Sequence, residues 1–147
     1  MPVSIDISNQ KILLIGGGKS AYKKLKLLHR FDAEVEVLAI HVCNEIKESG
    51  VKYVESAYSK EKLKGYFMLY SCTNNDELNQ QILSDGKELG VLVNIHDKPE
   101  LCQFVSPAIY KNGKMTVAVA SNGEDVYESI RLRNEIKEFL TREKHNV

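Results

Sequence analysis

The sequence predicts an α/β fold, a Rossmann-like doubly wound parallel sheet followed by a β-hairpin and a long helix. Short apolar runs alternate with helical patterns between residues 11 and 95. The triplet Gly16-Gly17-Gly18 separates the first of these runs from the first helical pattern. After residue 108 the pattern changes to a hairpin signal, Asn112-Gly113, and one long amphipathic stretch. Such alternation is typical of parallel strands connected by helices that cover both faces of a sheet.

Composition excludes several classes of protein. The chain has 147 residues and a formal net charge of zero, so no nucleic-acid partner is expected. It has no apolar run long enough to cross a membrane and no signal-peptide pattern, so we expect no membrane partner. The three cysteines are odd in number and far apart, which favours reduced thiols and a cytoplasmic location.

The chain begins with a lead-in whose alternating Val3, Ile5 and Ile7 predict a short edge strand. The five strands of the main sheet are then expected where short apolar runs occur. They are placed at residues 12–15, 34–39, 51–54, 67–71 and 91–95.

Helices are expected between these strands. After the glycine triplet, Tyr22, Leu25 and Leu28 follow one another at helical spacing. Short helices are predicted at residues 44–49 and 59–63, and a longer one at 76–89 that Gly90 ends. In the last part, strands at 109–110 and 115–120 flank a turn, and a helix covers residues 124–143. A hairpin and one helix have little core of their own, so they must pack on the first domain or on a second copy of the chain. We therefore divide the chain into domains at 1–108 and 109–147.

The glycine triplet fits a dinucleotide-binding fingerprint, Gly16-x-Gly18-x-x-Ala21. Gly16 lets the backbone leave the strand, Gly18 lets a pyrophosphate approach the main chain, and Ala21 lets the helix pack closely. The N–H groups of the first helical turn would then bind the phosphates. The alternative is a plain strand-to-helix turn of a flavodoxin-like fold.

The second strand ends in Ala39-Ile40-His41, without the acid that usually binds the adenosine ribose. The sequence therefore leaves NAD and NADP both open. His41 at this tip is either a contact to adenosine or a solvated loop histidine.

Two polar turns follow later strands. Cys72-Thr73-Asn74-Asn75 comes after the fourth strand and His96-Asp97 after the fifth. Ligands of open α/β sheets bind at these strand ends. Asp97 is either a base beside a nicotinamide or a turn residue before Pro99.

At this point the chain resembles the precorrin-2 dehydrogenases, which occur alone or as the N-terminal part of siroheme synthases. The resemblance covers nearly the whole chain and depends on four motifs in order. They are Ile15-Gly16-Gly17-Gly18-Lys19-Ser20-Ala21-x-x-Lys24, Cys72-Thr73-Asn74-Asn75-x-x-Leu78-Asn79, Val93-Asn94-x-x-Asp97-x-Pro99-x-x-Cys102-x-Phe104-x-x-Pro107-Ala108, and Val119-Ala120-Ser121-Asn122-Gly123.

The resemblance implies an oxidoreductase of siroheme (porphyrin) biosynthesis that oxidises precorrin-2 to sirohydrochlorin with NAD. It also implies a homodimer built through the hairpin and the long helix. Asp97 would be the catalytic acid/base. The dinucleotide would be held by Gly16, Gly18, Lys19, Ser20, Ile40, His41, Thr73 and Asn94, and the substrate by Ser121, Asn122 and Arg131.

The chain departs from the family in two places. After Gly123 the family usually has Ser-Pro one residue on, where this chain has Asp125-Val126. The family also usually continues into a further helical segment after the point that corresponds to Val147. These departures keep open an NAD-binding sensor without turnover and a structural dimerisation domain.

Metal insertion, a second activity of some relatives, is a further possibility. We predict no metal ligands, because the spacing of His96, Asp97 and Cys102 matches no standard ligand set.

Overall fold

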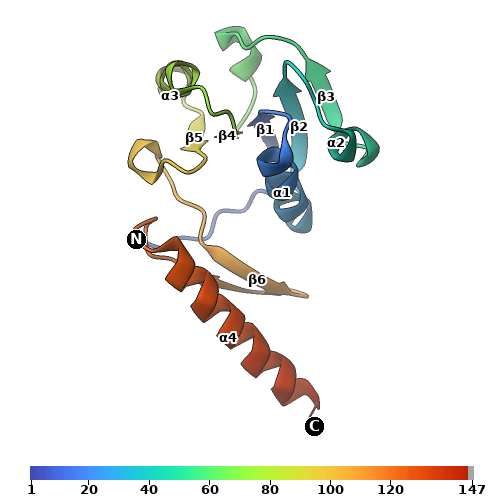
Figure 1. Ribbon diagram of the computed structural model, residues 1–147, viewed down its shortest axis with the longest axis vertical. Coiled ribbons are helices and arrows are strands. Elements are labelled where there is room, and N and C mark those ends of the chain that lie inside the picture. Colours follow the sequence, from blue (N-terminus) through green and yellow to red (C-terminus); the bar gives the residue numbers. More distant parts are fainter. Residues whose placement is uncertain (146–147) are drawn as a thin grey trace. The chain divides into compact units, whose positions relative to one another are not determined.

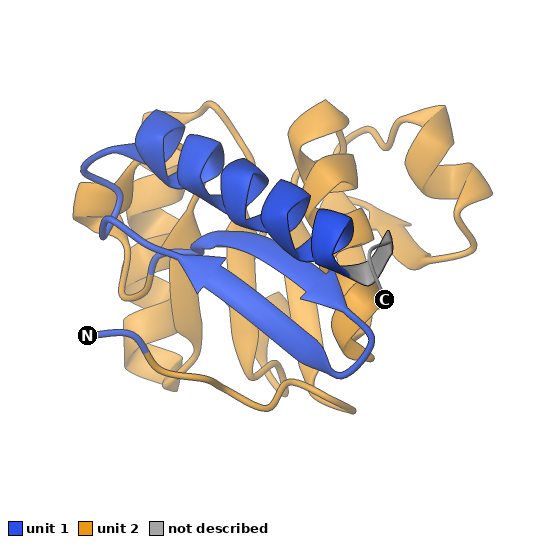
Figure 2. Ribbon diagram, turned by 90° about the horizontal axis from the view of Figure 1, so that it is seen from below, with its two compact units in different colours: residues 1–2, 105–147 blue, residues 3–104 orange. Residues whose placement is uncertain are grey.

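The structure is a computed structural model that describes residues 1–145. The chain forms two compact units (Figure 2). The larger contains Val3–Phe104, and the smaller contains Met1–Pro2 and the chain from Val105 onward. Each unit is described by itself.

The larger unit contains a five-stranded parallel sheet. Its strands are β1 (Lys11–Ile15), β2 (Glu34–Ala39), β3 (Lys52–Glu55), β4 (Met68–Ser71) and β5 (Leu92–Ile95). The strand order is β3-β2-β1-β4-β5 (Figure 1). Every neighbouring pair is parallel. The predicted Rossmann-like sheet is confirmed.

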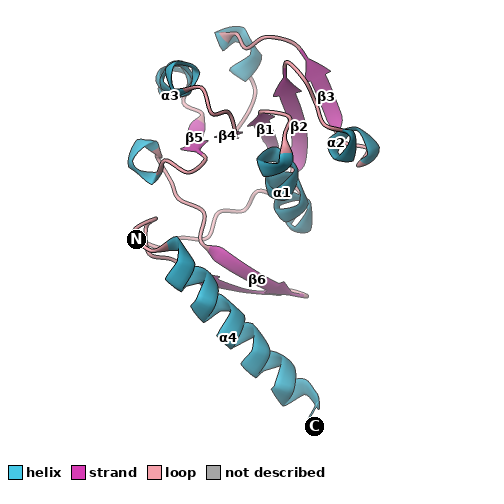
Figure 3. Cartoon of the chain, in the orientation of Figure 1, coloured by secondary structure: helices cyan, strands magenta, loops and turns pink. Residues whose placement is uncertain are grey.

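Helices and 3₁₀ turns connect the strands (Figure 3). They are α1 (Lys19–Leu28), η1 (His29–Phe31), α2 (Asn44–Glu48), η2 (Lys60–Leu63), α3 (Asp76–Leu89) and η3 (Pro99–Leu101). The helix predicted at 59–63 is a 3₁₀ turn, and η1 and η3 were not predicted. The bounds of α3 agree with the prediction because both ends carry strong signals. Asn75 Oδ1 accepts a hydrogen bond from the Leu78 N–H at 3.0 Å, and Gly90 adopts a left-handed φ of 71°.

Side chains from alternate strand positions form two cores, one on each face of the sheet. On one face α1 and α2 pack on the sheet through Leu25, Leu28 and Ile46. On the other face η2 and α3 pack on it through Leu63, Ile82 and Leu83. Both faces of the central strand β1 are buried, which explains its run of apolar residues without polar alternation.

The strand order places the topological switch point between β1 and β4. The chain runs from β1 outward through β2 to β3, and then returns to the other side of β1 as β4. In open α/β sheets, ligands bind outside the carboxyl ends of the strands at such a point.

The predicted edge strand at residues 3–7 is wrong. Within the described residues this segment contains no strand; the Asp6 carboxylate accepts from the Ser8 N–H at 3.0 Å, and a turn around Asn9 follows. In the part of the chain that the structure describes, the five strands of the sheet pair only with one another, so this segment adds no sixth strand at either open edge, β3 or β5. Only Ile7 packs on the core, whereas Val3 and Ile5 are exposed.

The smaller unit contains the predicted hairpin and long helix. Strands β6 (Ala108–Asn112) and β7 (Met115–Val119) are antiparallel, and α4 (Val126–His145) packs along both of them (Figure 2). The turn is tighter than predicted because Asn112 pairs with Met115, and Gly113 takes a φ of 57°. Arg133 of α4 donates from Nη1 to the Ile109 carbonyl oxygen at 2.9 Å, which ties the helix to the hairpin.

Candidate functional site: the carboxyl ends of the parallel strands

The turn after β1 brings two backbones close together. Gly16 has a φ of +122°, which L-residues rarely adopt, and its N–H donates to the Leu38 carbonyl at 2.8 Å. A Cβ at Gly16 would lie 3.0 Å from both the carbonyl carbon and oxygen of Cys72. Glycine is therefore required here for the end of β1 to pass beside the end of β4.

Gly17 was not among the predicted site residues, because the fingerprint leaves its position open. A Cβ at Gly17 would lie 2.0 Å from the His41 carbonyl oxygen and 2.8 Å from the Cα of Val42. The Gly17 carbonyl also accepts a hydrogen bond from the Cys43 N–H at 2.8 Å. Gly17 thus joins the glycine turn to the loop after β2, and the unbroken triplet was the only sequence signal for it.

The first turn of α1 is open where a phosphate would approach. Gly18 is the N-cap residue with a φ of −96°, and a Cβ there would meet nothing within 4 Å. Among the described residues no side chain caps this helix end, and its first turn carries no acid. The N–H groups of Lys19 and Ser20 lack partners within the helix. Ala21 is fully buried, as the fingerprint predicted.

The loop after β2 presents the other predicted nucleotide contacts. Ile40 is 68% exposed, which is unusual for a large apolar side chain that follows a buried strand. His41 is exposed beside it. Both lie next to the glycine turn, because the His41 carbonyl contacts Gly17.

A buried polar network shapes the turn after β4. Asn79 of α3 is 1% exposed, accepts a hydrogen bond from Ser71 Oγ at 2.7 Å and donates to the Thr73 carbonyl at 3.1 Å. Thr73 Oγ1 accepts from the Asn75 N–H at 3.1 Å. Thr73, a predicted dinucleotide contact, is therefore held in place by the first turns of α3.

Asn94 lies in β5 and Asp97 just after it, and their side chains differ in exposure. Asn94 is buried and its Nδ2 donates to the Phe104 carbonyl at 2.9 Å, so this nitrogen of the predicted dinucleotide contact is used within the fold. Asp97 has a left-handed φ of 60°, and its side chain is 86% exposed. His96 Nε2 lies 3.3 Å from Asp97 Oδ2. A hydrogen bond from the Lys98 N–H to the Ile95 carbonyl closes the turn that presents Asp97.

Burial and two charged groups influence the Cys72 thiol at the switch point. Lys24 Nζ of α1 lies 4.5 Å from the centroid of the Tyr70 ring, and burial lowers the pKa of Lys24. Burial raises the pKa of Cys72 to about 11; Lys24 opposes this rise and the Asp97 carboxylate adds to it. Asp97 and Lys24 therefore come within electrostatic range of the same thiol.

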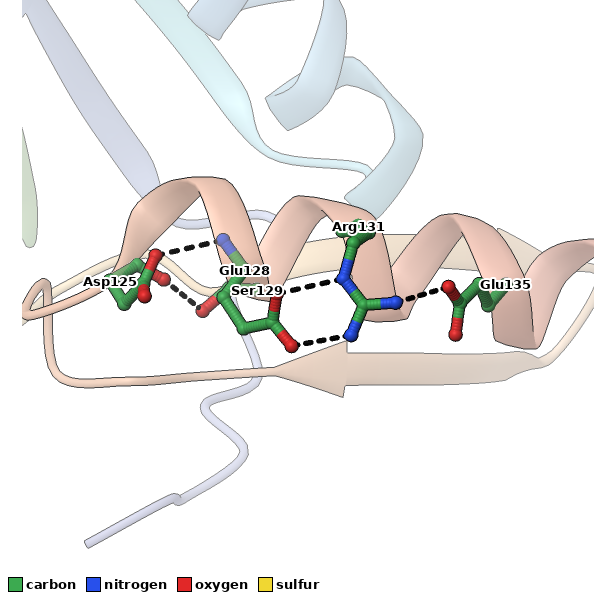
Figure 4. Close-up of polar contacts among 5 residues, drawn as sticks. All are labelled: Asp125, Glu128, Ser129, Arg131 and Glu135. Carbon is green, nitrogen blue, oxygen red and sulfur yellow. Dashed lines mark hydrogen bonds and ion pairs between the residues drawn. The ribbon is translucent and has the colours of Figure 1, made fainter.

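The three predicted substrate residues lie in the smaller unit, before and within the first turns of α4. Figure 4 shows Arg131 and the contacts at the start of this helix. Ser121 Oγ accepts a hydrogen bond from the Asp125 N–H at 2.9 Å, and Asn122 has a left-handed φ of 55°. Asp125 Oδ1 in turn accepts from the Glu128 N–H at 2.9 Å. Asp125, the departure from the family pattern, is thus the N-cap of α4.

Arg131 is held by two glutamates (Figure 4). Its guanidinium binds both carboxylate oxygens of Glu128, from Nε at 2.8 Å and from Nη2 at 2.5 Å, and also pairs with Glu135. These contacts raise the pKa of Arg131. A substrate carboxylate at Arg131 would have to compete with both glutamates.

Across residues 1–145, no three His, Cys, Asp or Glu side chains lie close enough together to hold a metal ion. The helices described for the chain include none that is long and apolar enough to span a bilayer.

The features at the strand ends define the class of the larger unit. A Rossmann sheet whose first turn is a glycine turn opening onto a helix N-terminus is an NAD(P)-binding domain. The chain belongs to the NAD(P)-binding domain family of siroheme synthases and SirC-like precorrin-2 dehydrogenases. Residues 3–108 match the family model described as "Putative NAD(P)-binding".

Curated relatives have the same domain within longer chains. The chain is 33% identical over 84% of its length to the "Probable multifunctional siroheme biosynthesis protein HemA" of Ruminiclostridium josui, of which it covers 25%. It is 31% identical over 84% of its length to the siroheme synthase of Nitrosococcus oceani, of which it covers 27%. The chain thus spans about a quarter of the length of these relatives.

A solved structure shares the fold. "SirC, precorrin-2 dehydrogenase" superposes with a TM-score of 0.73 over 94% of this chain and 70% of that chain, at 20% sequence identity. At this identity the likeness shows the fold alone, including the hairpin and the long helix that follow the sheet.

Proposed function

We propose that this chain oxidises precorrin-2 to sirohydrochlorin with NAD, as a step of siroheme biosynthesis. One observation carries the proposal: three neighbouring strand ends bring a dinucleotide-type turn and an exposed carboxylate to one edge of the sheet. Gly16 follows β1 and contacts Cys72 after β4, and Asp97 after β5 lies close enough to add to the pKa of that thiol. The family relationship supports the same reading.

The residues at this edge fit a dinucleotide. The space beside Gly18 suits a pyrophosphate, and the N–H groups of Lys19 and Ser20 would bind it with the favourable end of the helix dipole. Exposed Ile40 and His41 would contact the adenosine half, and the turn at Thr73 would contact the half toward β4. Asn94 is less suited to contact the dinucleotide, because its Nδ2 already donates a hydrogen bond to the Phe104 carbonyl.

The reaction removes a hydride and a proton from the tetrapyrrole. When bound, NAD supplies the hydride acceptor, which no side chain of the protein can provide. Asp97 would accept the proton, because a carboxylate on a loop beside the dinucleotide site can act as a general base. The left-handed backbone and the turn hydrogen bond at Lys98 hold Asp97 outside the β5 core. Its carboxylate is therefore accessible to a substrate.

The proposal extends to the smaller unit by resemblance. Ser121, Asn122 and Arg131 would bind carboxylates of the substrate, and the hairpin with α4 would form a homodimer. The second candidate is an NAD-binding sensor without turnover. Two observations favour it: Arg131 is already paired with two glutamates, and Ser121 is used to cap the segment before α4.

Anaerobic turnover of enzymatically made precorrin-2 with NAD tests the proposal, with product formation followed by absorbance. Asp97→Asn should lower turnover by about 10²–10⁴-fold, the usual contribution of a general base, while NAD still binds. Asparagine is chosen because it tolerates the left-handed backbone that alanine would not. Asp32→Asn is the matched control, since Asp32 is also left-handed (φ 56°) but follows η1.

Each outcome decides between the candidates. NAD-dependent product from the wild type and from Asp32→Asn, but not from Asp97→Asn, supports the dehydrogenase. Full turnover by Asp97→Asn would refute the role of Asp97. NAD binding without any product from the wild type would favour the sensor.

A further inference from the structure

The outer end of the dinucleotide site lacks its usual acid. In dinucleotide folds a carboxylate after the second strand binds the adenosine ribose hydroxyls and disfavours the 2′-phosphate of NADP. Here the corresponding residues are Ala39-Ile40-His41-Val42-Cys43. The sequence therefore leaves open how this end of the site would distinguish the two nucleotides.

Glu55 brings a carboxylate to this place from the neighbouring strand. It is the last residue of β3 and pairs in register with Ala39, the last residue of β2. The Ser56 N–H donates to the Ala39 carbonyl at 2.8 Å, which continues the pairing past the strand ends. The Glu55 side chain then reaches across to β2, where Oε1 accepts from the Val42 N–H at 2.9 Å.

The loop that Glu55 holds also contacts the glycine turn. Cys43 donates its N–H to the Gly17 carbonyl at 2.8 Å, and the His41 carbonyl lies against the Cα of Gly17. Glu55, the loop 40–43 and the turn where the phosphates would bind are thus one connected structure. This is the end of the site where the adenosine ribose of a dinucleotide is expected.

Glu55 forms an ion pair that leaves part of its carboxylate available. Lys47 Nζ of α2 lies 2.9 Å from Glu55 Oε1, and the Glu55 side chain is 39% exposed. The hydrogen bond from Val42 and the pairing with Lys47 both lower the pKa of Glu55, so the group is ionised at neutral pH. In the described part of the chain both contacts fall on Oε1, and Oε2 is left for a ligand.

We propose that Glu55 and Lys47 together determine the choice between NAD and NADP at the dinucleotide site, an inference that rests on the proposed function. The Glu55 carboxylate accepts a hydrogen bond from an adenosine ribose hydroxyl and repels a 2′-phosphate. The same carboxylate is paired with Lys47, which would otherwise be a cation available to that phosphate. The acid of the usual β2 position is thus replaced by one from β3.

Substitutions of these two residues should have opposite effects on the choice of nucleotide. Glu55→Gln keeps an oxygen that can accept from Val42, but it removes the repulsion and releases Lys47. It should shift the ratio of the NADP and NAD dissociation constants toward NADP by about tenfold or more, because a unit charge a few ångströms from a phosphate is removed. Lys47→Met leaves the Glu55 charge without its partner and should shift the ratio further toward NAD.

The experiment is titration calorimetry of NAD and NADP with the wild type and both variants. Glu48→Gln, which removes one exposed acid from the last turn of α2, is the control for net charge and should leave the ratio unchanged. Circular dichroism melts establish that each variant is folded. If Glu55→Gln does not fold, Lys47→Met still tests the inference without changing Glu55.

The outcomes separate this inference from the proposed function. An unchanged ratio in either folded variant overturns the inference, as does an equal loss of both nucleotides in Glu55→Gln, which would make Glu55 a support of the loop only. If the wild type binds neither nucleotide, the dinucleotide site itself is wrong and both proposals fail. Opposite shifts in the two variants, with the control unchanged, support the inference.

Discussion

The three adjacent glycines differ in what a side chain would meet. At Gly16 a Cβ would press on the backbone of Cys72, and at Gly17 it would lie 2.0 Å from the His41 carbonyl oxygen. At Gly18 it would meet nothing within 4 Å. Backbone contacts cannot move as a flexible side chain can, so the first two glycines are required by the fold. The third is required only by a ligand that must approach the main chain.

Substitutions at Gly17 and Gly18 should therefore separate folding from binding. Gly17→Ala should lower the free energy of unfolding by about 1–3 kcal/mol, the usual cost of overpacking. Gly18→Val should lower it by no more than about 1 kcal/mol, the cost of a poor N-cap, yet abolish NAD binding. Urea denaturation and titration calorimetry measure the two quantities. If folded Gly18→Val still binds NAD normally, our placement of the pyrophosphate is wrong.

Among the elements, α4 begins where the chain departs from its family. Asp125 accepts from the Glu128 N–H, and Ser129 donates from Oγ to the Asp125 carbonyl at 2.8 Å (Figure 4). A negative charge at a helix N-terminus is also favoured by the helix dipole. The aspartate that replaces the family pattern thus stabilises the start of the helix.

Removal of this cap should destabilise the helix. Asp125→Ala should lower the free energy of unfolding by about 1 kcal/mol, while Asp125→Asn, which can still accept from Glu128, should lower it by less than half as much. Chemical denaturation followed by circular dichroism measures both. Equal stability of the alanine variant and the wild type would show that the cap hydrogen bond contributes nothing.

The elements also show why some predictions succeeded and one failed. The end of α3 was predicted from Gly90, whose left-handed backbone ends a helix locally, and the structure adds the Asn75 cap at its start. The run at residues 3–7 alternates like a strand, but it does not lie alongside either open edge of the sheet, β3 or β5. Whether a segment reaches such an edge depends on the tertiary structure, which local alternation does not contain.

At the scale of the whole molecule, α4 leaves apolar side chains exposed. Phe139 is 62% exposed, and Leu132, seven residues earlier on the same side of the helix, is also exposed. Met115 of β7 is exposed too. Exposed apolar side chains on a helix that already packs on a hairpin suit the proposed homodimer.

Sedimentation velocity tests this proposal. If α4 forms the dimer interface, Phe139→Glu should convert the wild-type dimer to a monomer, because a buried unpaired carboxylate is costly. Lys137→Gln, at an exposed polar position on the same helix, should leave the dimer intact. A monomeric wild type, or a dimer that Phe139→Glu does not affect, would contradict the proposal.

The candidate site was predictable only in part. Gly16, Gly18 and Ala21 follow from a short-range pattern, because one turn determines all three positions. Gly17 and Glu55 were not predicted, because their partners, His41 and Val42, come from a strand end elsewhere in the chain. Asn94 was predicted as a ligand contact, yet its Nδ2 holds the Phe104 carbonyl, a contact ten residues along the chain.

The Rossmann class, the main strands and helices after residue 10, the glycine turn and the family could all be read from the sequence alone. These depend on periodicity and on local backbone conformation, which neighbouring residues specify. Only the tertiary structure decided which strand ends meet, and so that Asp97 and Lys24 act on the same thiol and that Glu55 lies beside the loop after β2. The physical reason is that such contacts form between strands whose neighbours are chosen by packing of the whole sheet, and no local pattern records that choice.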